Sequence, residues 1–438
     1  MVDKNQSQVE VIFVNHASFI LSHDGINLIT DPWFTGTAFN HGWELLVNTP
    51  EQFHSFEGIT HIWFSHEHPD HFSPADLKRI PEERRPEVTI LYQETMDRKV
   101  IDFCAKLGFS LLELKTGELY SLSPTFSITC APFTGGDSWA YFRVLDLGIL
   151  NVNDCILNNL DDCRNLLPFI GKVDVLCTQF GYANWVGNPE NLEMRQQAAK
   201  EKLGRIKTQS DIFAPKFILP FASFVRFCHE ENVYLMDAQN TVLVANDFIL
   251  AQTKAKPLIM FPGDSLDLPI QGDHSSMEAL EKYALVYSDI KNSALKTSPS
   301  VSVDVLKDRA LDFIEALITK NPTAKPLIQK MNPKIYIWDY NQAYILNGLK
   351  GLQEIKENEE CCDIKMSSDS LHYFFRFEWG GDTLNVNGRF RQTKYGDIYR
   401  FELFTKMRSL NNRGEVYHYQ APSLFAKLKF RFKRMFNK

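Results

Sequence analysis

The residues best suited to chemistry lie in one short stretch, His66–His71, which holds three imidazoles and two carboxylates in six residues. His66 and His68 can turn toward one metal ion, and Asp70 and His71 can reach a second ion on the other side. Imidazole and carboxylate ligands suit Zn²⁺, iron and Mn²⁺ alike, so these side chains do not select the metal. The alternative is a polar surface loop, but four ligand-type residues at this H-x-H-x-D-H spacing favour a metal site.

The elements on either side place this stretch on a loop between a strand and a helix. "THIWFS" (60–65) has the pattern of a buried strand. Ser73 suits a helix N-cap, Pro74 the first helical position, and Asp76 the reciprocal capping position. A helical HExxH zinc motif is excluded, because Pro69 would break a helix there.

Composition predicts a soluble cytoplasmic protein with more than one domain. The chain has 438 residues, 44% of them hydrophobic, and a net charge of −7. That charge gives no reason to expect a nucleic-acid partner. It has no apolar run of about 18 residues, and no apolar segment at its N-terminus. Its 8 cysteines form no disulfide framework and show no CxxC, zinc-ribbon or Rieske pattern.

Short β-branched and aromatic segments recur through the first part of the chain, with helical segments expected at 75–80 and 96–107. The expected strands lie at 9–15, 18–24, 26–31, 60–65, 88–93, 126–132, 141–146, 148–154 and 172–180. Alternating hairpins and helices predict an α+β or α/β sandwich that carries its site at strand ends.

The later part of the chain predicts a separate α+β domain. We expect a metal-binding domain over 1–258, a second domain over 259–424, and a basic amphipathic tail over 425–438. The second domain contains an amphipathic helix, Val303–Lys320, and a hairpin within 372–391. The tail is a possible peripheral membrane contact, and a solvated tail or a last docked helix is the alternative.

Taken together, these motifs resemble the metallo-β-lactamase fold superfamily, whose H-x-H-x-D-H loop follows a buried strand. The resemblance implies an α+β fold, the αββα sandwich, with a one- or two-metal site on its edge. Asp31, in "DPW", resembles the superfamily's first acidic motif, which supports the metal loop from beneath. Asp154, in "ILNVNDC", resembles the acid that bridges two metals.

A finer resemblance, over residues 10 to 240, is to CMP-N-acetylneuraminate hydroxylase and its bacterial relatives. It rests on "DPWFTGTAFNHGWELL" (31–46), the metal loop, "ILNVNDC" and "ILPFASFVRFCHEENVYL" (218–235). Those proteins hydroxylate the N-acetyl methyl group of a nucleotide-linked sugar, using O₂ and delivered electrons. The resemblance implies two iron ions, with O₂ as co-substrate. No Rieske domain is encoded here, so a separate ferredoxin or reductase is expected to deliver electrons.

Two departures from the hydrolase pattern bear on the ligand set. Phe133 stands where a third-motif histidine is expected, which leaves Asp137 as the nearest ligand-type residue. A carboxylate there would make a more oxygen-rich site that favours iron, although Asp137 also fits a Gly-Gly-Asp turn. Ala222 replaces another histidine, and His229 matches the hydroxylase pattern instead. If 222–229 is helical, residues seven apart share a face, so His229 can point toward the site. We expect His229 to be a ligand, with a core histidine as the alternative.

Further side chains are expected around the metals. His16 matches a histidine of the superfamily's first hairpin, and we expect it to support the site without binding metal. Four aromatic residues are expected to wall the pocket of a small-molecule substrate, with ordinary core packing as the alternative; they are Trp33, Trp43, Tyr182 and Trp185.

The leading hypothesis is a di-iron oxygenase in which Asp70 and Asp154 are also the catalytic residues. Its expected ligands are His66, His68, Asp70, His71, Asp137, Asp154 and His229. The runner-up is a dinuclear zinc or manganese hydrolase acting on a phosphoester, amide or lactone, in which Asp70 orients the attacking water. A non-catalytic metal-binding scaffold is the third hypothesis.

Overall fold

A computed structural model describes residues 8–270 and 276–419, which divide into two compact units. The first unit comprises residues up to Thr297 together with 386–388, and the second begins at Ser298. The division falls later than the 258/259 boundary expected from composition. The reason is that β17 (Ser265–Leu268) pairs with β1 (Val9–Asn15), which places it in the first unit. The predicted tail, 425–438, lies outside the described residues.

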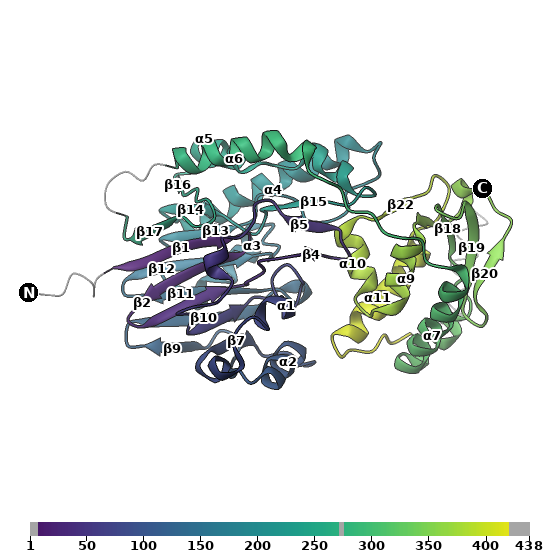
Figure 1. Ribbon diagram of the computed structural model, residues 1–438, viewed down its shortest axis with the longest axis horizontal. Helices are drawn as coiled ribbons and strands as arrows, with labels where there is room; N and C mark the ends of the chain where they lie inside the picture. Colours follow the sequence, from purple (N-terminus) through teal and green to yellow (C-terminus); the bar gives the residue numbers. More distant parts are fainter. Residues whose placement is uncertain (1–7, 271–275, 420–438) are drawn as a thin grey trace, which may run out of the picture. The chain divides into compact units, whose positions relative to one another are not determined.

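The first sheet of the first unit has seven strands, in the order β17-β1-β2-β3-β6-β7-β8 (Figure 1). Antiparallel hairpins join β1, β2 and β3, whereas β3, β6, β7 and β8 run parallel. The remaining strands are β2 (Ser18–His23), β3 (Ile26–Thr30), β6 (His61–Phe64), β7 (Thr89–Gln93) and β8 (Ser110–Leu114). The parallel half directs the carboxyl ends of β3 and β6 to one edge of the sheet.

The second sheet also has seven strands, in the order β16-β14-β13-β12-β11-β10-β9. It repeats the same design, because β9 to β12 are antiparallel and β12, β13, β14 and β16 are parallel. Its strands are β9 (Leu119–Ser123), β10 (Phe126–Pro132), β11 (Ser138–Val144), β12 (Leu147–Asn153), β13 (Val175–Thr178), β14 (Phe217–Pro220) and β16 (Lys256–Pro257).

The two sheets pack face to face, and helices cover their outer faces (Figure 1). The Phe142 ring of the second sheet packs edge-on against Phe19 and Trp63 of the first, at centroid distances of 6.0 and 5.8 Å. The helices are α1 (Pro74–Leu77), α2 (Lys99–Leu107), α3 (Leu160–Arg164), α4 (Leu192–Phe213), α5 (Val242–Gln252) and α6 (Met277–Asp289). The αββα sandwich predicted for the first domain is confirmed.

A third, three-stranded sheet of the first unit has the order β15-β5-β4. It consists of β15 (Val225–Phe227), β5 (Trp43–Leu45) and β4 (Thr37–Ala38). The helical geometry considered for 222–229 is therefore wrong, since Val225–Phe227 pairs antiparallel with Trp43–Leu45. The strand alternates its side chains, so the seven-residue spacing does not place His229 on the face of Ala222.

The second unit has its own α+β architecture around a five-stranded sheet, β20-β19-β18-β21-β22. The strands are β18 (Lys334–Ile337), β19 (Gln342–Asn347), β20 (Gly351–Ile355), β21 (Ile364–Met366) and β22 (Phe390–Gln392). The helices are α7 (Val303–Lys320), α8 (Lys325–Ile328), α9 (Ser368–Arg376), α10 (Gly380–Asn387) and α11 (Tyr399–Asn412). Helix α7 occupies the predicted residues. Its apolar face is buried, and consists of Leu306, Ala310, Phe313, Ile314 and Leu317.

The hairpin predicted within 372–391 is wrong, because this segment contains the second half of α9 and all of α10. Aromatic residues in "HYFFRF" suggested a strand, but Leu371, Phe374 and Phe375 recur at helical spacing and are all buried. Ser367 starts the helix, since its side chain accepts a hydrogen bond from the Ser370 N–H.

Two further findings concern the chain as a whole. All eight cysteines are free thiols. Among the described residues, no helix has both the length and the apolar character that crossing a bilayer requires.

Candidate metal centre

The side chains singled out in the sequence follow strand ends at one edge of the sandwich. His16 lies in the turn between β1 and β2, and Asp31 directly follows β3. The His66–His71 loop follows β6, while Asp137 precedes β11 and Asp154 directly follows β12. Parallel strands of open sheets gather their following loops at one edge, which is where α/β proteins build their sites.

The metal loop is a compact turn held at its C-terminal side. The His71 and Phe72 N–H groups both donate to the His68 carbonyl, at 3.0 and 2.8 Å. Ser73 caps α1 as predicted, but Asp76 plays a different part from the one expected. Its carboxylate accepts the Phe34 N–H at 2.9 Å and the Ser73 hydroxyl at 2.8 Å. It therefore ties the segment after Asp31 to the metal loop.

Asp31 lies beneath the metal loop and joins it to both sheets. Its carboxylate accepts hydrogen bonds from the Ser65 N–H and hydroxyl, both at 2.8 Å, and from the Asn153 amide at 2.5 Å. The Nδ1 atom of His71 lies 3.0 Å from the same carboxylate. An imidazole that donates from Nδ1 to a carboxylate presents its Nε2 lone pair on the other side, as metal-ligating histidines do.

Within the part of the chain that the structure describes, the ligand-type side chains form three groups, and in each group the possible ligand atoms lie no more than 4.8 Å apart. The groups are His66 with His68 and Asp137, His16 with Asp70 and His71, and His66 with His71 and Asp154. The group that contains Asp154 shares His66 with the first group and His71 with the second. The bridging role expected for Asp154 from the sequence would need a carboxylate in this place, and it stays a prediction.

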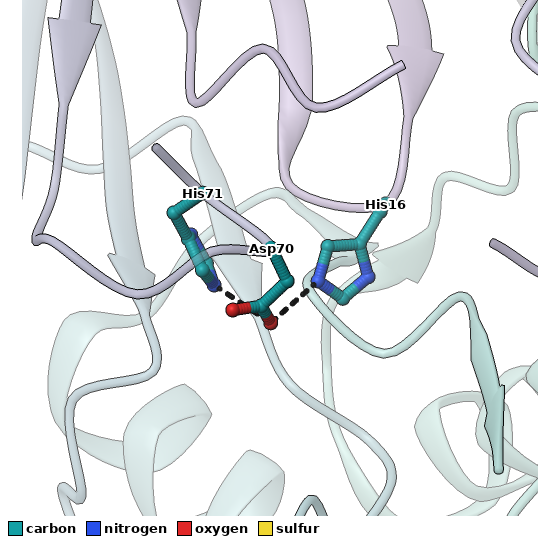
Figure 2. A group of neighbouring side chains, drawn as sticks. All are labelled: His16, Asp70 and His71. Atoms are coloured by element: carbon teal, nitrogen blue, oxygen red, sulfur yellow. Dashed lines mark ion pairs between the residues drawn. The ribbon is translucent and has the colours of Figure 1, made fainter. Parts of the chain in front are cut away.

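The second group is drawn in Figure 2, where Asp70 lies between the two imidazoles. The Nε2 atoms of His16 and His71 are each 3.4 Å from Asp70 Oδ2. In the first group, His66 Nε2 lies 2.8 Å from His68 Nδ1 and 3.7 Å from Asp137 Oδ1. His71 Nε2 is 3.6 Å from Asp154 Oδ1.

The donor set fits metal ions because several buried polar atoms have no hydrogen-bond partner. These atoms are both ring nitrogens of His16, Nε2 of His71, and Oδ1 of Asp70. The three side chains are no more than 2% exposed. Leaving such a group buried without a partner costs roughly 1–3 kcal/mol each, and coordination of a metal ion would remove that cost.

The charges of the site also favour cations. Burial lowers the pKa of His66 to about 4, and the charge on His71 acts in the same direction. Burial also lowers the pKa of His68, so both imidazoles are neutral at pH 7 and can ligate metal. Burial alone would lower the pKa of His71, but the carboxylates of Asp70, Asp154 and Asp31 raise it well above its ordinary value. The field that holds a proton on His71 would also attract a metal cation.

The pKa values of the Asp154 and Asp137 carboxyl groups shift in opposite directions. Burial tends to raise the pKa of Asp154, but His71 and His66 hold it at about 2. Burial and the charge of Asp154 raise the pKa of Asp137 to about 6. Asp137 is therefore the carboxylate that most needs an added positive charge to stay ionised.

The two histidines outside the loop are placed differently from the sequence-based expectation. His16, expected only as a supporting residue, shares a group of possible ligands with Asp70 and His71. His229, expected as a ligand, belongs to none of the three groups found among residues 8–270 and 276–419. Its Nδ1 accepts the Glu231 N–H at 3.2 Å and lies 3.8 Å from the Glu231 carboxylate.

The aromatic residues expected to wall a pocket are mostly buried. Trp33, Trp43 and Tyr182 are each 2% exposed and belong to one apolar cluster of the first unit. Trp33 packs perpendicular to His16, with ring centroids 5.9 Å apart. Phe39, from the same cluster, packs in the same way against His68 at 5.8 Å. These side chains form an apolar backing for the histidines, and their contact with substrate stays a prediction.

Two neighbours of the candidate ligands, Ser65 and Asn153, were not among the residues predicted from the sequence. Ser65 links His66 to Asp31, since its hydroxyl lies 2.9 Å from His66 Nδ1 and donates to Asp31. Asn153 donates to Asp31 from the other sheet. Their positions next to predicted ligands, at the ends of β6 and β12, are the signal that would have found them.

Comparison with known families agrees with this architecture. Residues 10–120 match the model of the β-lactamase superfamily domain. The chain thus carries a metallo-β-lactamase superfamily domain, and its first unit has the metallo-β-lactamase fold. The additional C-terminal α/β region is the second unit.

Over part of its length, the chain is distantly similar to cytidine monophosphate-N-acetylneuraminic acid hydroxylase. It is 32% identical to the Xenopus laevis protein over 108 residues, which are 24% of this chain and 18% of that protein. It is 24% identical to the Danio rerio protein over 311 residues, which are 63% of this chain and 49% of that protein. The chain thus spans less than half the length of either relative.

Similar solved structures include CmlA, a diiron β-hydroxylase from Streptomyces venezuelae, at 15% identity and a TM-score of 0.38, covering 61% of this chain and 55% of that one. They also include Igni18, a metallo hydrolase from Ignicoccus hospitalis, at 14% identity and a TM-score of 0.41. That match covers 60% of this chain and 100% of Igni18.

Proposed function

We propose that this protein is a di-iron oxygenase that hydroxylates a C–H bond of a small polar metabolite. The substrate class is a nucleotide-linked sugar or a related N-acylated sugar. The two iron positions would be those of His66, His68 and Asp137, and of His16, Asp70 and His71. Asp154 would span the two positions.

The observation that carries this proposal is the presence of Asp137 beside His66 and His68. The position that would complete a three-histidine zinc site is filled by a carboxylate, whose Oδ1 lies 3.7 Å from His66 Nε2. Three carboxylates and four imidazoles would then surround two metal ions. Oxygen-rich sites with histidine suit iron and manganese, whereas zinc sites are dominated by nitrogen and sulfur ligands.

Bound iron would supply the activation of O₂, and the protein side chains supply order and shelter. Asp70 is held between two imidazoles, so its carboxylate keeps one orientation toward the second metal position. Asp31 fixes the His71 ring through Nδ1 and fixes Ser65, which orients His66. Trp33 and Phe39 exclude water from the apolar side of the histidines.

The partial similarity to cytidine monophosphate-N-acetylneuraminic acid hydroxylase supports this chemistry and the substrate class. That relative is named for hydroxylation of a nucleotide-linked N-acetylated sugar. We assign the supply of electrons to a separate ferredoxin or reductase. This chain alone is therefore expected to turn over substrate only when a reductant is added.

The test is the metal content and oxygen consumption of protein purified without air. We expect about two iron ions per chain, an oxo-bridged di-iron absorption band after exposure to O₂, and substrate-dependent O₂ uptake with a ferredoxin and its reductase. A His66→Ala variant should lose iron and O₂ uptake together. His61→Ala, which removes a histidine that belongs to no candidate metal group among the described residues, should retain both.

Other results would overturn the proposal. Two zinc ions per chain with turnover of a phosphoester, amide or lactone would establish the hydrolase instead. Full iron occupancy without any substrate-dependent O₂ uptake or hydrolysis would favour the non-catalytic scaffold.

A further inference from the structure

Lys202 is a buried lysine close to the candidate metal centre. It lies in the middle of α4, and its side chain is 9% exposed. Its Nζ donates to the Gln179 side-chain carbonyl oxygen at 2.6 Å. No carboxylate of the described residues forms an ion pair with Lys202, and burial lowers its pKa to about 8. A buried ammonium held only by a neutral partner costs free energy, so its retention calls for another explanation.

Gln179 connects this lysine to the metal centre. It directly follows β13, and its Nε2 donates to Asp154 Oδ1 at 2.7 Å and to the Ala222 carbonyl at 3.4 Å. A side-chain amide has two different ends, one that only accepts and one that only donates. Lys202 therefore binds the accepting end, and Asp154 receives the donating end.

The orientation of this amide depends on the lysine. An ammonium group has three donors and cannot accept, so it tolerates only the oxygen of Gln179 beside it. Without Lys202, the amide could rotate by half a turn and place its oxygen against the Asp154 carboxylate. Two acceptors would then face each other, and Asp154 would lose the hydrogen bond that holds Oδ1.

We propose that Lys202 is a positioning residue of the metal centre, which fixes the Gln179 amide so that it holds Asp154 in its bridging orientation. This inference rests on the metal centre of the proposed function. It adds a residue from α4, 48 positions after Asp154, that no metal motif contains. Hydrogen-bond partners of metal ligands typically contribute 10–100-fold to metal affinity, which is the effect expected here.

The test compares Co²⁺ binding and thermal unfolding of variants of the full chain. Lys202→Met removes the ammonium, Lys202→Arg keeps a donor, and Gln179→Leu removes the amide. Lys200→Met is the matched control, because it makes the same change at an exposed position of α4. Co²⁺ reports both affinity, by competition with a chelator, and ligand geometry, by its d–d absorption.

We expect Lys202→Met to bind one of two Co²⁺ ions about 10–100-fold more weakly and to change the d–d spectrum. Lys202→Arg should recover most of that affinity, and Lys200→Met should match the wild type. The melting temperature of Lys202→Met should be unchanged or higher, since a buried charge without an ionic partner has been removed. The Lys202→Met/Gln179→Leu double variant should be no weaker than Gln179→Leu, because the lysine acts through the amide.

Unaltered Co²⁺ affinity in Lys202→Met would overturn the inference, and so would additive losses in the double variant. A Lys202→Met variant that no longer folds, or a Lys202→Arg variant as weak as Lys202→Met, would assign the lysine to the stability of the fold instead. These outcomes leave the metal centre intact. A wild-type protein that binds no Co²⁺ would overturn the metal centre itself, and this inference with it.

Discussion

Two buried histidines of the first unit, His16 and His229, are 2% and 0% exposed but have different surroundings. His16 lies in the β1–β2 turn at the carboxyl end of β1, and neither of its ring nitrogens has a hydrogen-bond partner. Its Nε2 faces the Asp70 carboxylate. His229 follows β15 in the small sheet, and its Nδ1 accepts the Glu231 N–H.

The difference shows that burial and residue type alone do not place a histidine in a candidate metal group, whereas a position at the edge of the sandwich does. Every side chain in the three groups of possible ligands follows the end of a strand of the two large sheets or sits in the turn between two of them. His229 follows a strand of the third sheet, and its ring is already engaged by its own backbone turn.

His66→Ala should have the largest effect, because His66 belongs to two of the three groups. We expect both metal ions to bind more than about 100-fold more weakly, since the variant loses a ligand of one position and a neighbour of the other. Isothermal titration calorimetry with the metal ion measures the affinity of each equivalent. Loss of only one metal equivalent would show that the two positions bind metal independently, and would contradict the inference that both depend on His66.

His16→Ala and His229→Ala test the contrast directly. We expect His16→Ala to weaken one metal equivalent about 10–100-fold, because Asp70 and His71 lose their third partner. His229→Ala should leave metal affinity unchanged and lower the free energy of unfolding by about 1–3 kcal/mol, because its buried hydrogen bond is lost. Metal titration and urea unfolding of both variants measure these effects. Weaker metal binding in His229→Ala, with unchanged binding in His16→Ala, would support the prediction from the sequence that His229 is the ligand.

Asp31→Asn should have a smaller effect on metal binding, of about tenfold. The Asn153 amide and the Ser65 hydroxyl both donate to Asp31 Oδ2, and the Ser65 N–H donates to Oδ1, so an amide nitrogen in either place would face a donor. His71 would also lose the carboxylate that orients its ring. Metal competition with a chelator measures the loss, and an affinity equal to that of the wild type would mean that the carboxylate does not position the loop.

Trp33→Phe should have the smallest effect on the metals. The ring that packs against His16 is kept in part, and only the hydrogen bond from Trp33 Nε1 to the Thr35 carbonyl is lost. We expect metal affinity to change less than about threefold and stability to fall by about 1 kcal/mol, measured by titration and urea unfolding. A large loss of metal affinity would show that Trp33 positions the metal ligands and does more than pack against His16.

The fold of the first unit could be predicted from the sequence because its local signals agree. β1 and β10 occupy the residues predicted from β-branched periodicity, and α7 of the second unit occupies those predicted from its apolar face. Ser73 and Pro74 marked the start of α1 for the same reason, since caps are local features. The predicted hairpin within 372–391 failed because aromatic residues favour strands weakly, and helical packing overrode that preference.

The metal loop was predicted because all four of its side chains lie within six residues. The remaining ligands depend on which strand ends meet in space, which spacing along the chain does not reveal. His16 lies 54 positions before Asp70 in the sequence and 3.4 Å from it in the structure. Lys202 and Gln179 belong to no motif at all, because their connection to Asp154 exists only once α4 has packed on the second sheet.

The most direct test of the dinuclear centre is an anomalous-difference map from crystals of the iron-loaded protein, recorded at the iron absorption edge. We expect two peaks about 3.5–4 Å apart, one beside His66, His68 and Asp137 and the other beside His16, Asp70 and His71. A single peak, or a peak beside His229 with none beside His16, would contradict the proposed dinuclear centre.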